Sequence, residues 1–119
     1  ADDTQAKNLE LIGLKPRDAI RSFLSQEWLD AQIAQIEAKS DRELAKPEET
    51  IKQVTAKLRY TSAQQDDILK MFIKSGDTTT GGVMHAVTAS AQNQTDADLA
   101  ADMEADAFRV LDLAVQYAG

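Results

Sequence analysis

The 119-residue sequence contains no cysteine, two prolines, five glycines and 5 % aromatic residues. Without cysteine the chain has no disulfide framework, no thiol nucleophile and no thiolate metal site. The shortage of aromatic and β-branched runs disfavours strands. No apolar run approaches the length of about 20 residues that a transmembrane helix needs. We therefore expect no membrane association, and a cytoplasmic location is the default expectation.

What the sequence contains in quantity is helix-forming material. Apolar residues make up 43 % of the chain, and Ala, Gln, Leu, Lys, Asp and Glu are frequent. A chain of this length suits one domain with a modest core. We predict an all-α fold, a compact orthogonal bundle of five or six helices. Residues 1–14 are expected to form a loosely held lead-in segment, and residues 15–119 a single helical domain.

The net charge is −7, and the negative charge is concentrated in the second half. Residues 1–60 hold ten Lys/Arg against eleven Asp/Glu, whereas residues 61–119 hold three against nine. Nucleic-acid binders usually gather Lys and Arg to neutralise phosphates, so direct nucleic-acid binding is disfavoured. Lys52, Lys57 and Arg59 form at most a local basic patch, and a solvated helix face is the favoured interpretation.

Two prolines mark helix starts in the first half. Pro16 is predicted to begin a helix, because the first turn needs no partner for the missing N–H. The apolar spacing after it indicates one long amphipathic helix, or two with a break near Ser25, ending before Pro47. Pro47 begins the next helix, which runs to about Arg59 and has the acids of "PEE" at the positive end of its dipole.

The clearest boundary is "TSAQ" at 61–64, a capping box in which Thr61 and Gln64 satisfy each other's backbone amides. A helix over 62–74 follows. Its run "ILKMFI" is more apolar than one thin stripe requires, which predicts a central position. Gly76 stands where a left-handed residue would end the helix.

Two more helices are predicted, over 80–92 and over 96–118, with Thr95 as the N-cap of the second. The last helix has an apolar stripe that is expected to be buried: Leu99, Met103, Ala107, Val110, Ala114 and Tyr117.

The stretch "SGDTTTGGVMHAV" at 75–87 raises the question of a phosphate-binding loop. Such a loop requires GxxxxGK[ST] spacing and its lysine, and both are missing. A joint between two helices is the favoured interpretation, over an anion site or a partner contact. Asp77 would act as an N-cap or as a turn residue ahead of a cap at Thr78 or Thr79. Gly81 and Gly82 predict close backbone contact with a neighbouring helix.

His85 is the only histidine. On a helical wheel it lies with Thr88 and Gln92, on the polar side. Because no second histidine exists and no acid occurs three or four residues away, a surface histidine is favoured over a metal ligand or an acid–base catalyst. We predict no catalytic residue, no metal and no cofactor.

The last predicted helix also carries a line of charged residues, Asp98, Asp102, Asp106, Arg109 and Asp112. A solvated face is the favoured interpretation, and an electrostatic docking surface or a metal site is the alternative. If fully exposed, the row is also a candidate mimic of DNA phosphates.

The segment 68–104 resembles the C-terminal helical part of a family of phage- and plasmid-associated bacterial proteins of unassigned function. The family differs from this chain at His85, where it often has Asn, at Gly81, and at Ala107 and Phe108. Its large preceding domain does not fit into the 60 upstream residues, so the resemblance implies a detached tail domain or a small independent relative. It also implies a mobile-element context in a bacterial cell, and no reaction. The matching residues are Gly76, Asp77, Thr79, Gly82, Ala86, Val87, Thr88, Ala91, Gln92, Asp96, Asp98 and Glu104.

The sequence therefore favours a non-enzymatic protein-interaction domain, accessory to a phage- or plasmid-associated bacterial protein and acting in the cytoplasm on a protein partner. One alternative is an acidic DNA-mimic inhibitor of a nucleic-acid-binding host protein, and another is a small enzyme that uses His85. The oligomeric state stays open. The candidate partner surface comprises Thr79, His85, Thr88, Gln92, Asp98, Asp102 and Asp106.

Overall fold

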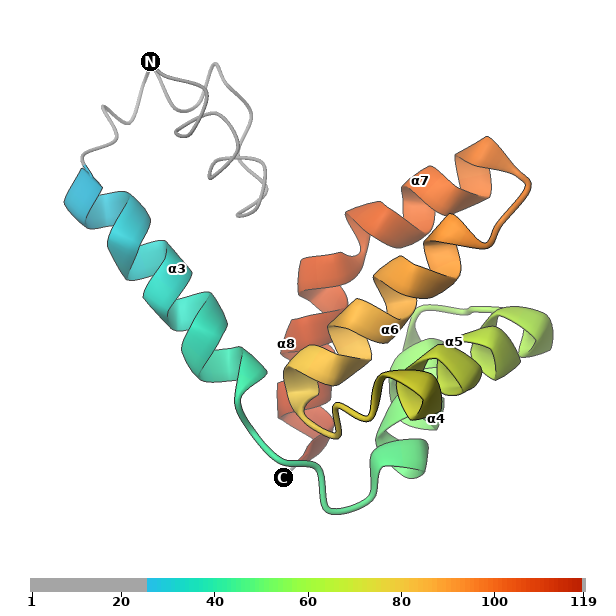
Figure 1. The fold of residues 1–119 in the computed structure, drawn as a ribbon, viewed down its shortest axis with the longest axis horizontal. Coiled ribbons are helices and arrows are strands. Elements are labelled where there is room, and N and C mark those ends of the chain that lie inside the picture. Colours follow the sequence, from blue (N-terminus) through green and yellow to red (C-terminus); the bar gives the residue numbers. More distant parts are fainter. Residues whose placement is uncertain (1–25, 119) are drawn as a thin grey trace. The chain divides into compact units, whose positions relative to one another are not determined.

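The computed structural model describes residues 26–118, and these residues form six helices and no β-strand (Figure 1). This arrangement confirms the predicted all-α class. The predicted lead-in segment 1–14, the helix start at Pro16 and the alternative break near Ser25 lie outside the described residues.

The chain divides into two compact units, Ala1–Ala38 and Lys39–Gly119. Residues 26–38 of helix α3 (Gln26–Ser40) are the described part of the first unit, and the last two residues of this helix belong to the second unit. Leu29 on this helix is fully buried. The predicted domain boundaries, 15–119, stay a prediction, because the first of these residues are outside the described part.

Helix α4 (Pro47–Lys57) begins at the predicted proline. Its end is fixed by two backbone hydrogen bonds, from Arg59 N to Ala56 O at 3.1 Å and from Tyr60 N to Thr55 O at 2.9 Å. This pairing is a Schellman motif, which requires a left-handed residue between the helix and its exit. Arg59 takes that conformation, with φ of 59°, although it is not a glycine.

Helix α5 (Ser62–Ser75) begins at the predicted capping box. Thr61 N donates to Gln64 Oε1 at 2.8 Å, and Gln64 N donates to Thr61 Oγ1 at 3.2 Å. Gly76, with φ of 71°, ends the helix as predicted. Phe72 is buried, and α5 packs against α4 and α6. The predicted central position was wrong, because only Gln64, Ile68 and Phe72 of this helix are buried and α6 is the helix that packs against three others.

The stretch before helix α6 (Thr80–Gln92) is a structural joint, as predicted. The Thr79 hydroxyl caps α6 by accepting a hydrogen bond from Gly82 N at 3.2 Å. Asp77 is the turn residue ahead of this cap, because its carboxylate accepts from Thr79 N at 3.1 Å and from the Thr79 hydroxyl at 2.6 Å.

The segment that follows α3 runs alongside this joint. Leu44 N donates to Thr78 O at 3.1 Å, and Thr80 N donates to Arg42 O at 2.8 Å. The Thr80 hydroxyl donates to the carbonyl of Lys39. These bonds hold the start of the second unit against the N-terminus of α6.

The two glycines at the start of α6 are both required by close approach. A Cβ atom at Gly81 would lie 2.8 Å from Ser40 O, at the end of α3, which confirms the predicted contact with a neighbouring helix. A Cβ atom at Gly82 would lie 2.0 Å from Asp77 O, within the joint itself. The prediction of a neighbouring helix at Gly82 was therefore wrong, because the crowding comes from its own preceding turn.

The predicted single helix 96–118 is two helices, α7 (Ala97–Ala105) and α8 (Ala107–Ala118), which meet at Asp106. The predicted N-cap was also wrong. Asp96, rather than Thr95, caps α7 by accepting from Asp98 N at 2.9 Å and from Leu99 N at 3.2 Å. A carboxylate is at least as good an N-cap as a hydroxyl and adds a favourable charge at the helix dipole.

Helix α6 is the central helix of the second unit. It packs against α5, α7 and α8, and α4 closes the bundle by packing against α5 and α8 (Figure 1). None of the helices within residues 26–118 has the length and apolar character needed to cross a bilayer. The buried apolar residues of the unit form one core: Leu44, Ile51, Val54, Ile68, Phe72, Val83, Ala86, Val87, Ala91, Met103, Val110, Leu113 and Ala114.

Most of the predicted stripe of the last helix lies in or beside this core, but Ala107 is partly buried and belongs to neither group. Met103, Val110 and Ala114 are buried in it, and Leu99 and Tyr117 pack against it from partly buried positions. Apolar residues on both sides of the break at Asp106 therefore reach the same core, because α7 and α8 both pack against α6.

Candidate functional site

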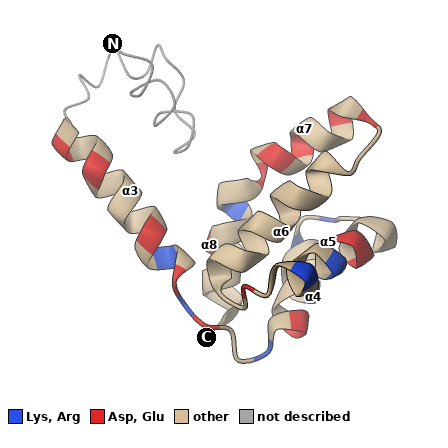
Figure 2. Cartoon of the chain, in the orientation of Figure 1, with Lys and Arg blue, Asp and Glu red and all other residues tan. Residues whose placement is uncertain are grey.

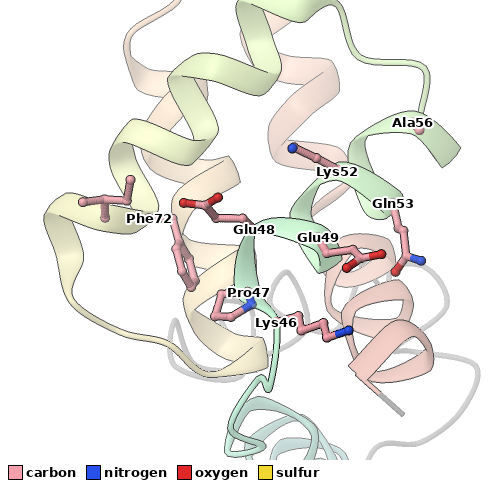
Figure 3. A pocket seen from close by; sticks show the side chains of 9 residues that line it. Lys46, Pro47, Glu48, Glu49, Lys52, Gln53, Ala56 and Phe72 are labelled. Carbon is pink, nitrogen blue, oxygen red and sulfur yellow. The ribbon is translucent and has the colours of Figure 1, made fainter.

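A hollow of about 920 Å³ opens on the surface where α4 and α5 meet. We call it the α4–α5 groove. Residues 46–49, Lys52, Gln53 and Ala56 line it from α4 and the residue before it, and Phe72 and Ile73 line it from α5. Figure 3 shows Glu48 pointing toward the α5 side of α4 and Glu49 pointing away from it.

The apolar part of the α4–α5 groove includes the one large apolar side chain that is exposed among the described residues. Ile73 is 68 % exposed, whereas its neighbour Phe72 is 4 % exposed. Pro47 and Ala56 extend this apolar surface on α4. An isolated exposed isoleucine is unremarkable by itself, but one placed in a hollow beside an aromatic ring is typical of interaction sites.

The rim of the groove is charged. Lys46, Glu48, Glu49 and Lys52 are all exposed. None of the four forms an ion pair or a side-chain hydrogen bond within residues 26–118. An apolar centre surrounded by hydrated charges has the general anatomy of a protein-binding surface.

The residues of the predicted partner surface lie in the joint, on α6, on α7 and at the α7–α8 break. Thr79 is the N-cap of α6, and its hydroxyl accepts a hydrogen bond from Gly82 N. On α6, His85 and Gln92 are exposed, and the partly buried Thr88 donates its hydroxyl to His85 O at 2.9 Å. The exposure of His85 and Gln92 agrees with the predicted polar side of this helix.

The acidic members of the predicted surface differ from one another. Asp98 and Asp102 on α7 are exposed, whereas Asp106 is partly buried and accepts a hydrogen bond of 2.8 Å from the Tyr60 hydroxyl. Further along the row, Asp112 forms an ion pair of 3.1 Å with Lys39. The row is therefore interrupted by the break between α7 and α8, and two of its carboxylates already have partners. That the seven residues act as one partner surface stays a prediction.

Tyr60 and Asp106 lie in a second hollow, of about 420 Å³, between the end of α4 and the α7–α8 break. Burial disfavours the phenolate and raises the pKa of Tyr60 well above its usual range, and the hydrogen bond to Asp106 and its negative charge add to this shift. Tyr60 therefore stays protonated at physiological pH. No local pattern in the sequence joins these two residues, which are 46 positions apart.

The joint before α6 contains a second perturbed acid. The hydrogen bonds from the Thr79 side chain and backbone lower the pKa of Asp77 below its usual value, and the nearby charge of His85 acts in the same direction. Asp77 is therefore ionised at neutral pH, as its place in the cap requires. His85 itself is exposed and lines neither of the two hollows. Within the described part of the chain, no three metal-ligating side chains lie together.

Comparison of the chain with protein-family models, with curated proteins and with solved structures gave no match in any of the three.

Proposed function

We propose that this chain is a non-enzymatic protein-interaction domain and that the α4–α5 groove receives a segment of its protein partner. The observation that carries the proposal is the exposure of Ile73, 68 %, within a hollow that also contains Phe72. Ile73 belongs neither to the core of the second unit nor to the partly buried residues packed against it.

A partner that covers Ile73 gains hydrophobic free energy. Complete burial of an isoleucine side chain contributes about 1.5–3 kcal/mol, of which the exposed two-thirds or so remains available. The partly exposed Pro47 adds apolar surface beside it, whereas Phe72, which is 4 % exposed, adds almost none. One such anchor with a polar rim fits the pattern in which a few central residues supply most of the binding energy.

The cellular context belongs to the same proposal. The resemblance of segment 68–104 to phage- and plasmid-associated proteins supports an accessory role in a bacterial cell. The segment includes Phe72 and Ile73, so the groove lies partly within the similar region.

An enzymatic role has weaker support. Tyr60 stays protonated and donates a hydrogen bond to Asp106, so its phenol is a poor base or nucleophile. His85 is exposed on α6, where water competes with any bound substrate.

A second candidate, an acidic mimic of nucleic acid, is favoured by one observation. Residues 76–119 contain seven Asp/Glu and a single arginine. Figure 2 shows acidic residues on α7 and none on α6. Asp98 and Asp102 are the acidic members of the row that are exposed and without an ion pair within residues 26–118.

The proposed function is tested by comparing variants in capture from a bacterial lysate. Ile73→Glu places a charge in the groove, and Gln116→Glu adds the same charge at an exposed position of α8. We expect partner proteins captured by the unmodified chain to be lost with Ile73→Glu and kept with Gln116→Glu. Equal capture by all three proteins, with both variants folded by circular dichroism, would contradict a role for the groove.

A further inference from the structure

The second hollow, between the end of α4 and the α7–α8 break, is separate from the α4–α5 groove. It has a volume of about 420 Å³ and shares no lining residue with the groove. We call it the Tyr60 hollow. Small-molecule sites have volumes of about 300–1,000 Å³, so the hollow has room for a small ligand. Its apolar lining residues are Leu58, Leu99, Met103 and Ala105.

A largely buried amide donor lines the Tyr60 hollow. Gln64 is 7 % exposed, and its Oε1 accepts a hydrogen bond of 2.8 Å from Thr61 N, which fixes the orientation of the amide. The Nε2 group of the same amide has no hydrogen-bond partner within residues 26–118. No side-chain nitrogen or oxygen of the described residues is both fully buried and without a partner. Nε2 therefore keeps the residual exposure of Gln64, and the hollow is where a ligand can reach it.

Arg59 lines the same side of the hollow. It takes a left-handed conformation, with φ of 59°, which disfavours every residue with a side chain. Residues in such conformations are concentrated at ligand sites. Its side chain is exposed and forms no ion pair or hydrogen bond within the described residues. Arg59 and Gln64 Nε2 are therefore two free donors, which suit a carboxylate.

Carboxylates line the side that α7 and the α7–α8 break supply. Asp102 is exposed and forms no ion pair within residues 26–118. Asp106 accepts the hydrogen bond from the Tyr60 hydroxyl through Oδ2, which leaves Oδ1 as a free acceptor. Both carboxylates raise the pKa of Tyr60, and Arg109 lowers it by less than Asp106 raises it. Negative charge therefore prevails at this side, which suits an ammonium group.

We propose that the Tyr60 hollow binds a free α-amino acid with an apolar side chain. The ligand carboxylate accepts hydrogen bonds from Gln64 Nε2 and Arg59, and the ligand ammonium group donates to Asp102 and Asp106. The ligand side chain contacts the apolar lining. The site is independent of the proposed function, because the hollow and the groove have no residue in common.

A zwitterion is preferred because the hollow has charges of both signs that are not paired with each other. Arg59, Arg109, Asp102 and Asp106 all line it, and no ion pair joins any two of them. An anion would be repelled by the two carboxylates, and a cation by the two guanidinium groups. A neutral ligand would satisfy the amide of Gln64 and leave the charged groups without partners. An α-amino acid has a partner for each kind of group.

The test titrates the full chain with L-leucine, L-leucinamide and 4-methylpentanoate by isothermal titration calorimetry. L-Leucinamide replaces the carboxylate of leucine by a neutral amide, and 4-methylpentanoate lacks the ammonium group. We expect leucine to bind with a Kd below about 1 mM. Each analogue should bind at least about tenfold more weakly, because it loses charge-assisted hydrogen bonds.

Two variants test the donor side. Gln64→Glu keeps an acceptor for Thr61 N, since Glu and Gln both serve in a capping box, but it replaces the Nε2 donor by a carboxylate oxygen. Gln65→Glu makes the same change at the next residue, outside the lining. We expect leucine binding to fall at least about tenfold in the first variant and to stay unchanged in the second. Arg59→Gly should also weaken it, although glycine is the usual residue at this position.

A second pair tests the acidic side. Asp102→Asn removes a carboxylate of the hollow, and Asp98→Asn removes one at an exposed position of α7 outside the lining. We expect Asp102→Asn to bind leucine at least about fivefold more weakly and to bind 4-methylpentanoate as well as before or better. Asp98→Asn should leave the binding of both compounds unchanged.

Four results would overturn the proposal. The first is no binding of leucine to the folded chain. The second is equal binding of L-leucinamide, which would assign the hollow to the N-terminus of a peptide. The third is equal binding of 4-methylpentanoate, which would make it a carboxylate site alone. The fourth is equal loss of leucine binding in Gln64→Glu and Gln65→Glu, which would place the bound leucine elsewhere. None of these results bears on the α4–α5 groove, so the proposed function is decided separately by the lysate comparison.

Discussion

The hydroxyl of Tyr60 donates a hydrogen bond of 2.8 Å to the carboxylate of Asp106, 46 positions later in the chain. Tyr60 follows the end of α4, and Asp106 is the residue at which α7 ends and α8 begins. The bond therefore connects the exit of one helix to the bend between two others. It also explains why one member of the acidic row is turned into the fold rather than toward solvent.

Tyr60→Phe should lower the free energy of unfolding by about 1–2 kcal/mol, because a partly buried carboxylate loses its donor. Urea denaturation at neutral pH measures this change. Tyr117→Phe is the matched control, since Tyr117 is also partly buried and donates no hydrogen bond within residues 26–118. We expect the control to change stability by less than about 0.5 kcal/mol.

The same pair of variants gives a pH test. Folding raises the pKa of Tyr60 above its usual value of 10.0, so the folded chain holds this proton when the unfolded chain has lost it. The stabilisation is fully present below about pH 10 and is lost as the pH rises toward the folded-state pKa. The unmodified chain should therefore lose more stability between about pH 9 and pH 11 than Tyr60→Phe. An identical alkaline loss in both proteins would contradict the raised pKa.

The three described glycines that end or begin helices should differ in their tolerance of alanine. Gly82→Ala should be the most destabilising, by at least about 2 kcal/mol, because its Cβ atom would lie 2.0 Å from Asp77 O. Gly81→Ala should follow, with its Cβ atom 2.8 Å from Ser40 O. Gly76→Ala meets no atom within 4 Å and should cost about 1 kcal/mol from its φ of 71° alone. Thermal unfolding of the three variants gives the order, and a Gly76 variant less stable than Gly82→Ala would refute it.

Arg59→Gly should stabilise the fold by about 0.5–1 kcal/mol, because a non-glycine residue at φ of 59° is strained and glycine is the usual residue of this motif. Chemical denaturation measures the gain. Lys57→Gly, two residues earlier at the end of α4, should instead destabilise by about 1 kcal/mol, since its helical conformation gives glycine no advantage. Destabilisation by Arg59→Gly would show that the arginine side chain contributes more than its backbone strain costs.

Phe72→Ala and Ile73→Ala compare two adjacent apolar residues of the groove. Phe72→Ala should lower the free energy of unfolding by roughly 3–5 kcal/mol, because the ring is 4 % exposed and belongs to the core. Ile73→Ala should change it by less than about 0.5 kcal/mol, because this side chain is 68 % exposed. Equilibrium unfolding checks both values, and a loss above about 2 kcal/mol for Ile73→Ala would mean that the residue serves folding rather than binding.

The sequence predicted those features whose physical cause is local. Pro47, the capping box at Thr61 and Gln64, and the left-handed Gly76 each act on residues within one helical turn. The N-cap at Asp96 was missed in favour of Thr95 because both residues are suitable caps, and the choice depends on where α7 begins.

Features that depend on distant contacts were not predictable in this way. The bend at Asp106 accompanies a hydrogen bond to Tyr60, and the helical pattern on either side continues through it. The run "ILKMFI" was expected to make its helix central, but α6 takes that position, and the spacing gave no sign that Ile73 is left exposed. The α4–α5 groove was missed for the same reason, since it requires α4 and α5 to be placed together.

The central claim, that a protein partner occupies the α4–α5 groove, is tested most directly by site-specific photocrosslinking in a bacterial lysate. A photoreactive residue at Ile73 reports on the groove, and one at Gln92 reports on the exposed side of α6 that the sequence analysis favoured. We predict a crosslinked partner from position 73 that is absent from position 92. A crosslinked partner from position 92 with none from position 73 would contradict the claim and place the interface on α6.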